Sequence, residues 1–210
     1  MDLIDHIQKS FHYAIELKKA SIEKLTQPIL DAGAILVKCI SDGNKILSCG
    51  NGGSACDAQH FAAELVNRFL MERDNLPAIA LTADTAVLTA IANDYSYQEV
   101  FAKQIKALGR ENDVLLAIST SGKSQNVIRA IQEARTHKMH IVALTGGDSN
   151  VIKKLLNDDD VEIRVPSNIT PHIQEIHVFV IHCLCDLIDK KLFDPNLKKV
   201  VWKDPIKKKI

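Results

Sequence analysis

Apolar and polar residues follow two different periods along the chain, and the change of period separates a helical start from a mixed region. Across residues 2–41, apolar side chains recur every three or four positions, as at Leu3, Ile7 and Phe11, which is the spacing of one helix face. Pro28 lies inside this stretch. Because an interior proline removes a helical hydrogen bond and clashes with the preceding turn, we expect a break or a restart there.

Short apolar runs replace this pattern beyond residue 41. Helical segments such as NVIRAIQEARTHK lie between most of them, and a last helix is predicted from about Thr170 to Phe193. This alternation is typical of an α/β fold in which helices flank both faces of a five-stranded parallel sheet. We expect one domain, with a helical region at 1–41, an α/β core at 42–195 and a basic tail at 196–210. The predicted strands are KILSCG (45–50), AIAL (78–81), VLLAIS (114–119), IVALTG (141–146) and VEIRVP (161–166).

Composition narrows the classes of protein that fit this layout. The 210 residues are 46% hydrophobic, which is enough for one sizeable core, and 26 basic residues balance 26 acidic ones. Zero net charge gives no support for direct nucleic-acid binding, and the run Lys207–Lys209 is expected to be a solvated chain end. The five cysteines are odd in number and form no CxxC pair, which favours a reducing compartment. Neither a signal peptide nor an apolar run of roughly 18 residues is present, so we expect a cytoplasmic protein with no membrane partner.

The loop STSGKSQ (119–125) has the composition of a phosphate-binding loop. It follows a predicted strand and opens a helix, and ligands of open parallel sheets bind beyond the carboxyl ends of the strands. Gly122 permits a tight turn, and the helix N-terminus adds free N–H groups and a positive dipole end. The pattern GxxxxGK[ST] is absent, so no nucleoside triphosphate is implied. The alternative is a plain helix cap, but a cap needs one hydroxyl and this loop has four, on Ser119, Thr120, Ser121 and Ser124.

Two other loops follow predicted strands. In GNGGS (50–54), Gly52 and Gly53 would let the backbone approach a ligand, and Asn51 adds a polar side chain. This signal is weaker, because glycine-rich turns after strands are common. TGGDSN (145–150) is interpreted as a plain turn and is assigned no role.

Side chains of the kind that bind metal ions occur on two predicted helices. His60 and Glu64 are four residues apart and therefore share a helix face. Helical rotation puts Gln174 and His182 of the last helix on neighbouring faces, roughly 80° apart. Two imidazoles, a carboxylate and an amide oxygen suit zinc or a similar ion, whereas an isolated helical histidine is more often structural. Spacing alone leaves both interpretations open, also for the remaining candidates of that helix, Glu175 and His177.

These motifs together are similar to a known family. STSG after a strand of a parallel sheet resembles the sugar isomerase (SIS) domain. GNGGSACDAQHFAAEL, AIAND, LLAISTSGKSQNVIRAI and IQEIHVFVIH resemble the bacterial phosphoheptose isomerases over nearly the whole chain. GNKIL, LPAIAL, VLTAIAND and CLCDLID are also similar to the replication initiator-associating protein, a non-catalytic binding protein of the same fold. Glu64, His182 and the second glycine of GNGGS favour the enzyme over initiator binding or over a regulatory sugar-phosphate sensor.

The resemblance implies a three-layer SIS fold and the conversion of D-sedoheptulose 7-phosphate to D-glycero-D-manno-heptose 7-phosphate for lipopolysaccharide. It also implies one zinc ion per site and a homotetramer, which agrees with the many apolar positions of residues 2–41. Matched by motif, Glu64 and His182 are the acid–base pair, and the metal ligands are His60, Glu64, Gln174 and His182. The implied substrate contacts are Asn51, Gly52, Gly53, Asn93, Asp94, Ser119, Thr120, Ser121, Ser124 and Gln174.

The chemistry of aldose–ketose conversion agrees with this set. A proton moves between C1 and C2, so one base can remove it and return it to the neighbouring carbon. Histidine titrates in the range needed to move protons among hydroxyls, and a divalent ion would stabilise the enediolate oxygens. A carboxylate bound tightly to zinc is a poorer base, so the sequence leaves open whether Glu64 serves mainly as base or as ligand.

Overall fold

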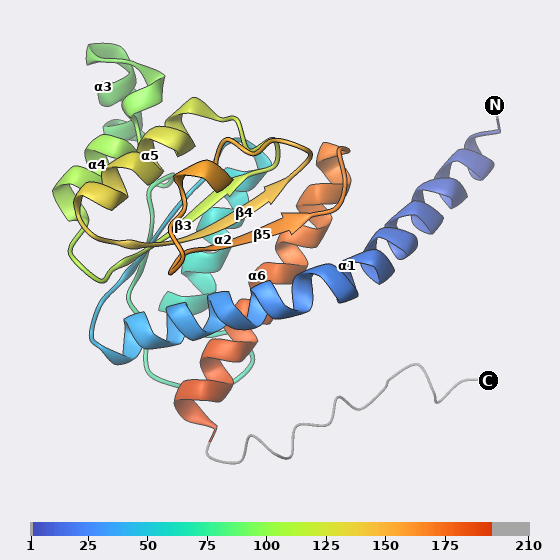
Figure 1. The fold of residues 1–210 in the computed structure, drawn as a ribbon, viewed down its shortest axis with the longest axis horizontal. Coiled ribbons are helices and arrows are strands. Elements are labelled where there is room, and N and C mark those ends of the chain that lie inside the picture. The colour runs from blue at the N-terminus through green and yellow to red at the C-terminus, as the bar shows by residue number, and fades with distance from the viewer. Residues whose placement is uncertain (1, 195–210) are drawn as a thin grey trace.

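The computed structural model describes residues 2–194 and shows an α/β fold built on one parallel sheet (Figure 1). The strand order is β2-β1-β3-β4-β5, and every neighbouring pair is parallel. All five predicted strands are confirmed, with ends that shift by no more than one residue, whereas the predicted tail at 196–210 lies outside the described residues. The strands are β1 (Ile46–Cys49), β2 (Ala78–Ala80), β3 (Val114–Ser119), β4 (His140–Gly146) and β5 (Val161–Val165).

Helices cover both faces of the sheet because the central strands are apolar on both sides. In β3, Leu116 and Ile118 point into one core cluster, while Leu115 and Ala117 point into the other. The first cluster lies under α1 (Leu3–Ser41), α2 (Gly53–Val66) and α6 (Thr170–Phe193). The second lies under α3 (Thr85–Asp94), α4 (Ala102–Leu108) and α5 (Gln125–Thr136), with the short 3-10 helices η1 (Tyr97–Glu99) and η2 (Lys153–Leu155) beside them. The result is the predicted three-layer arrangement.

The N-terminal region is one continuous helix, so the predicted break at Pro28 was wrong. α1 runs for 39 residues through Pro28. A proline removes only its own N–H from the helical ladder, and buried Leu25, Ala32 and Leu36 hold the helix against the core on both sides of it. Tertiary packing therefore outweighs the local cost of the proline.

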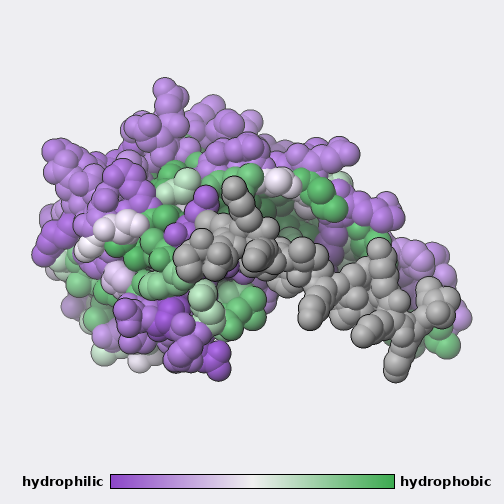
Figure 2. Space-filling view, turned by 90° about the horizontal axis from the view of Figure 1, so that it is seen from below, coloured by the Kyte–Doolittle hydropathy of each residue, from purple (hydrophilic) through white to green (hydrophobic). Residues whose placement is uncertain are grey.

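The first turns of α1 project away from the body of the molecule (Figure 1). Hydrophobic surface also gathers on the side seen in Figure 2, which is viewed from below Figure 1, where α1 and α6 lie. Large exposed apolar side chains on these two helices include Ile7, Phe11, Ile22 and Phe179. Within residues 2–194, no helix is both long and apolar enough to cross a membrane.

The strand order places a topological switch point between β1 and β3. The chain leaves β1 toward β2 on one side, and β3 continues toward β4 on the other. The loops that follow β1 and β3 therefore diverge from adjacent strand ends, which is where open α/β sheets bind their ligands. GNGGS and STSGKSQ are these two loops.

Candidate active site

A pair of amide side chains joins the two loops at the switch point. Asn51 donates from Nδ2 to Asn126 Oδ1, and Asn126 donates from Nδ2 to Asn51 Oδ1, both at 2.8 Å. The Tyr97 hydroxyl donates a further bond of 3.0 Å to Asn51 Oδ1. GNGGS is thereby fixed against the start of α5, beside the predicted phosphate loop. Asn126 and Tyr97 were not singled out in the sequence, because an amide partner so far along the chain leaves no local pattern.

Three of the four hydroxyl groups of STSGKSQ form hydrogen bonds within the loop. Ser119 Oγ donates to Ser124 Oγ at 3.0 Å, and the Lys123 N–H donates to Ser121 Oγ at 3.2 Å. Gly122 has a φ of 62°, in the left-handed region that glycine adopts without strain. Ser124 is the N-cap residue of α5, yet its side chain makes no capping hydrogen bond. The Ser124 side chain is therefore not a plain cap of α5, and phosphate binding at this loop stays a prediction.

Gly53 and Gln174 touch where α2 and α6 begin. A Cβ added to Gly53 would lie 2.3 Å from Gln174 Nε2, which is far inside van der Waals contact. Any larger residue at position 53 would displace the Gln174 amide. The contact brings the N-terminal part of α6 to the GNGGS loop, as the sequence resemblance implies.

His60, Glu64 and His182 lie along the seam between α2 and α6. His60 Nε2 and Glu64 Oε1 are 3.0 Å apart, and the rings of His60 and His182 have centroids 5.0 Å apart at an angle of 83°. The side chains of His60 and Glu64 are 36% and 24% exposed, so a ligand has access to both. The structure thus brings together candidates that are more than 100 residues apart in the chain.

The donor types at this seam fit zinc, although the side chains are not arranged around an ion. Two imidazoles and a carboxylate are common zinc ligands, with the Gln174 amide oxygen as a weaker fourth. In the described part of the chain, no group of three or more His, Cys, Asp or Glu side chains is set to hold a metal. His60 and Glu64 bond to each other instead, so they would have to separate to share an ion.

Three of the candidate residues from the sequence lie elsewhere or have a structural role. Asn93 and Asp94 are exposed at the end of α3, and Asn93 Nδ2 donates to Asp94 Oδ1 at 2.9 Å. His177 is fully buried and donates from Nε2 to the Thr145 carbonyl at 3.0 Å. Burial lowers the pKa of His177 to about 4, so its ring is neutral and serves the core.

Asp57 is a buried carboxyl group beside the site that the sequence did not reveal. Only 6% of the residue is exposed, and Oδ2 has no hydrogen-bond partner. Burial raises the pKa of Asp57 to about 6, and the charge of His60, one helical turn away, lowers it by a smaller amount. An acidic residue within the apolar pattern of a helix gives no signal of burial, so only the packing of α2 identifies it.

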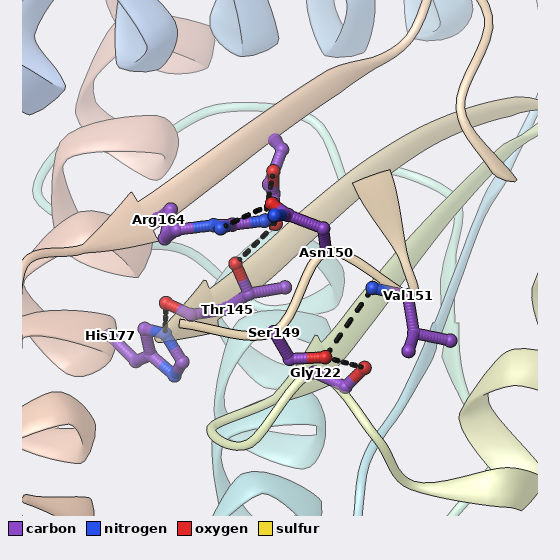
Figure 3. A network of polar contacts seen from close by, with 8 residues as sticks. Gly122, Thr145, Ser149, Asn150, Val151, Arg164 and His177 are labelled. Atoms are coloured by element: carbon purple, nitrogen blue, oxygen red, sulfur yellow. Dashed lines mark hydrogen bonds and ion pairs between the residues drawn. The ribbon is translucent and has the colours of Figure 1, made fainter. Parts of the chain in front are cut away.

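The loop after β4 contacts the predicted phosphate loop, a role that the sequence did not reveal. Figure 3 shows Ser149 beside Gly122, with its Oγ donating to the Gly122 carbonyl at 3.4 Å. Arg164 of β5 donates from Nη1 to Asn150 Oδ1 at 2.9 Å and forms an ion pair of 2.8 Å with Glu162. The loop is therefore held between β5 and the turn at Gly122.

Comparisons with known proteins agree with this arrangement. A model of the SIS domain matches residues 10–146. The phosphoheptose isomerase of Shewanella loihica is 56% identical over 191 residues, which are 91% of this chain and 97% of that protein. The phosphoheptose isomerase of Alkalilimnicola ehrlichii is 57% identical over 189 residues, 90% of this chain and 96% of its own. The chain belongs to the phosphoheptose isomerases of the SIS domain family.

Solved structures give the same result. Phosphoheptose isomerases from Neisseria gonorrhoeae and Francisella tularensis are each 46% identical and match 90% of this chain and 100% of their own, with TM-scores of 0.86 and 0.88. The predicted SIS fold is thereby confirmed. The chain is an isomerase, and the alternative of a non-catalytic protein that associates with the replication initiator is not favoured.

Proposed function

We propose that this isomerase converts D-sedoheptulose 7-phosphate to D-glycero-D-manno-heptose 7-phosphate, for the heptose of lipopolysaccharide. The observation that carries the proposal is the reciprocal amide pair of Asn51 and Asn126, which joins the GNGGS loop to the hydroxyl-rich loop beside the α2–α6 seam. The hydroxyl-rich loop would bind the phosphate end of the sugar, and the α2–α6 seam would act on its carbonyl end. The family relationship supports the same substrate.

The phosphate of the substrate would bind at the loop after β3. The hydroxyl groups of Ser119, Thr120, Ser121 and Ser124 would donate to its oxygens, and the N-terminus of α5 would add backbone N–H groups and a favourable dipole. Asn51, Gly52 and Gly53 would contact the sugar, with Asn93 and Asp94 as further expected contacts. The last two need a movement or a neighbouring subunit, because α3 holds them at its exposed end.

Glu64 and His182 would carry the proton transfers. Glu64 would remove a proton from one of the two carbons C1 and C2 and return it to the other, since a single base can serve both. His182 would move protons among the sugar oxygens. The support is the 3.0 Å contact between His60 and Glu64, which holds the carboxylate at the α2–α6 seam.

Zinc is the proposed metal, one ion per site, held by His60, Glu64, Gln174 and His182. Bound there, it would polarise the sugar carbonyl and stabilise charge on the enediolate oxygens. The support is the donor set, which the fold gathers from α2 and α6 into one seam.

We also propose a cytoplasmic homotetramer. The support is the row of exposed apolar side chains on α1, among them Ile7, Phe11 and Ile22, which a monomer would leave in water. Sedimentation of the purified protein at micromolar concentration tests the assembly, and a stable monomer would contradict it.

The proposed activity is tested by incubating purified protein with sedoheptulose 7-phosphate and measuring the heptose 7-phosphate formed. Turnover that the phosphate-loop variant S119A/S124A greatly weakens is the expected result. Binding of the sugar phosphate without turnover would instead favour a sensor, and capture of the replication initiator without turnover would favour the non-catalytic alternative.

A further inference from the structure

The imidazole of His182 is oriented by other rings rather than by hydrogen bonds. Among residues 2–194, neither ring nitrogen of His182 forms a hydrogen bond. Phe69 lies nearly parallel to the imidazole, with ring centroids 5.5 Å apart and an angle of 26°. His60 stands almost perpendicular to it at 5.0 Å. These distances and angles are those of stacked and edge-to-face aromatic pairs.

The segment that carries Phe69 is itself fixed by a buried arginine. Arg73, whose side chain is 1% exposed, forms an ion pair of 3.0 Å with Asp189, two turns beyond His182 on α6. Its guanidinium group also donates to the carbonyls of Glu64 and Leu65 at 2.7 and 2.8 Å. The segment between α2 and β2 is thereby held to the C-terminal turn of α2 and to α6 together.

Phe69 therefore lies beside His182 on a segment that is anchored four residues later, at Arg73. The phenyl ring is partly buried against the core cluster of α1, α2 and α6, which limits its own rotation. Because a flat ring beside the imidazole permits only a narrow range of planes, the stack limits how far the His182 ring can tilt.

We propose that Phe69 is a positioning residue for His182. The stack restricts the plane of the imidazole where it lies beside His60 at the α2–α6 seam, so that proton transfer by His182 starts from a narrow range of ring orientations. The expected effect on turnover rests on the proposed function, whereas the expected effect on the orientation of the His182 ring rests on the ring geometry alone. Transfer steps depend steeply on such alignment, whereas binding of the phosphate end does not.

The test compares three variants of the full-length protein. F69L removes the ring and keeps apolar bulk, F69Y keeps the ring, and F193L is the matched control, because Phe193 is also a partly buried phenylalanine packed against the same core cluster. We expect F69L to lower kcat by about tenfold or more, with KM within twofold of wild type. F69Y should restore kcat, and F193L should leave it unchanged.

A second measurement detects the stacking of Phe69 on His182 by NMR and does not depend on enzyme activity. In protein with 13C-labelled histidine, the imidazole proton signals of His182, assigned by their loss in H182Q, should shift in F69L as the ring current of Phe69 disappears. They should change little in F69Y and F193L.

The two measurements separate failure of this inference from failure of the proposed function. If the wild type does not convert sedoheptulose 7-phosphate, the isomerase proposal fails while the His182 signals still report the stack. Unchanged His182 signals in F69L overturn the positioning role. An equal loss of kcat in F69L and F193L, or a loss that F69Y does not restore, also overturns it.

Discussion

Replacing Gly53 with alanine is expected to abolish most activity while leaving the protein stable. Gly53 opens α2, and a Cβ there would lie 2.3 Å from Gln174 Nε2 and 2.9 Å from Gln174 Cδ. The obstacle is the far end of a flexible side chain, so the amide can move away without disturbing the backbone. The change therefore acts on the site and spares the fold.

The size of the displacement follows from the contact. Ordinary contacts with a Cβ begin at 3.4 Å, so the Gln174 amide has to retreat by about 1 Å. A misplacement of about 1 Å at a reacting centre can cost about 10²-fold in rate, and we expect a loss of kcat/KM of that order. Stability should stay within about 1 kcal/mol of wild type, because alanine is the better helix former and offsets part of the rearrangement.

Gly43 offers a control with the opposite signature. It has a φ of 79°, and an added Cβ would meet nothing within 4 Å. G43A should therefore cost about 1–2 kcal/mol through backbone strain alone. Gly43 lies between α1 and β1, away from the carboxyl ends of the strands, so its activity should match wild type.

Both variants are assayed by conversion of sedoheptulose 7-phosphate and by urea unfolding at one fixed protein concentration. The expected pattern is an inactive, stable G53A and an active, less stable G43A. If G53A keeps activity within a few-fold of wild type, then the position of Gln174 does not matter to the reaction. If G53A unfolds at markedly lower urea, the contact belongs to the core and the argument from a flexible amide is wrong.

Three further predictions concern charge and metal. E64Q should lower kcat by about 10²–10⁴-fold at an unchanged urea midpoint, and activity within a few-fold of wild type would reject Glu64 as the base. A chelator should lower activity and zinc should restore it, with H182A weakening zinc binding and turnover together, whereas full activity of metal-free protein would reject the zinc site. For Asp57, the native pKa of about 6 against 3.8 means that the folded protein keeps a proton which the unfolded chain loses, so wild-type stability falls as pH rises between these values. Relative to wild type, D57N should therefore gain about 2 kcal/mol of unfolding free energy between pH 4 and pH 7, and a difference that stays constant with pH would contradict the raised pKa.

The sheet could be predicted because its signal is local. Each strand is a short apolar run that ends in Gly, Ser or Thr, and β3 at Val114–Ser119 was located to the residue. Parallel pairing followed from the helices between the runs. The predicted break at Pro28 was wrong because the packing of α1 on α6 outweighs the local preference of one residue. This packing cannot be predicted from the sequence pattern.

The site residues likewise divide into those with a local sequence signal and those without one. STSGKSQ is visible in sequence because its chemistry and its position after a strand are contiguous. Phe69 and Asp57 are not visible, since their roles depend on what α6 places opposite them. The proximity of His60 and His182 came from the family resemblance, as helix spacing could relate each only to neighbours on its own helix.

The two roles of Glu64 compete for the same carboxylate oxygens. In the structure, Glu64 Oε1 lies 3.0 Å from His60 Nε2, an arrangement that is compatible with Glu64 as a general base. An ion between the two side chains would replace this bond and withdraw electron density from the carboxylate, which weakens it as a base. Both roles are compatible only if the metal is held mainly by the imidazoles and Gln174, so that one carboxylate oxygen stays free. H60Q then separates the cases: it should weaken zinc binding more than E64Q does, whereas E64Q should cost more in kcat.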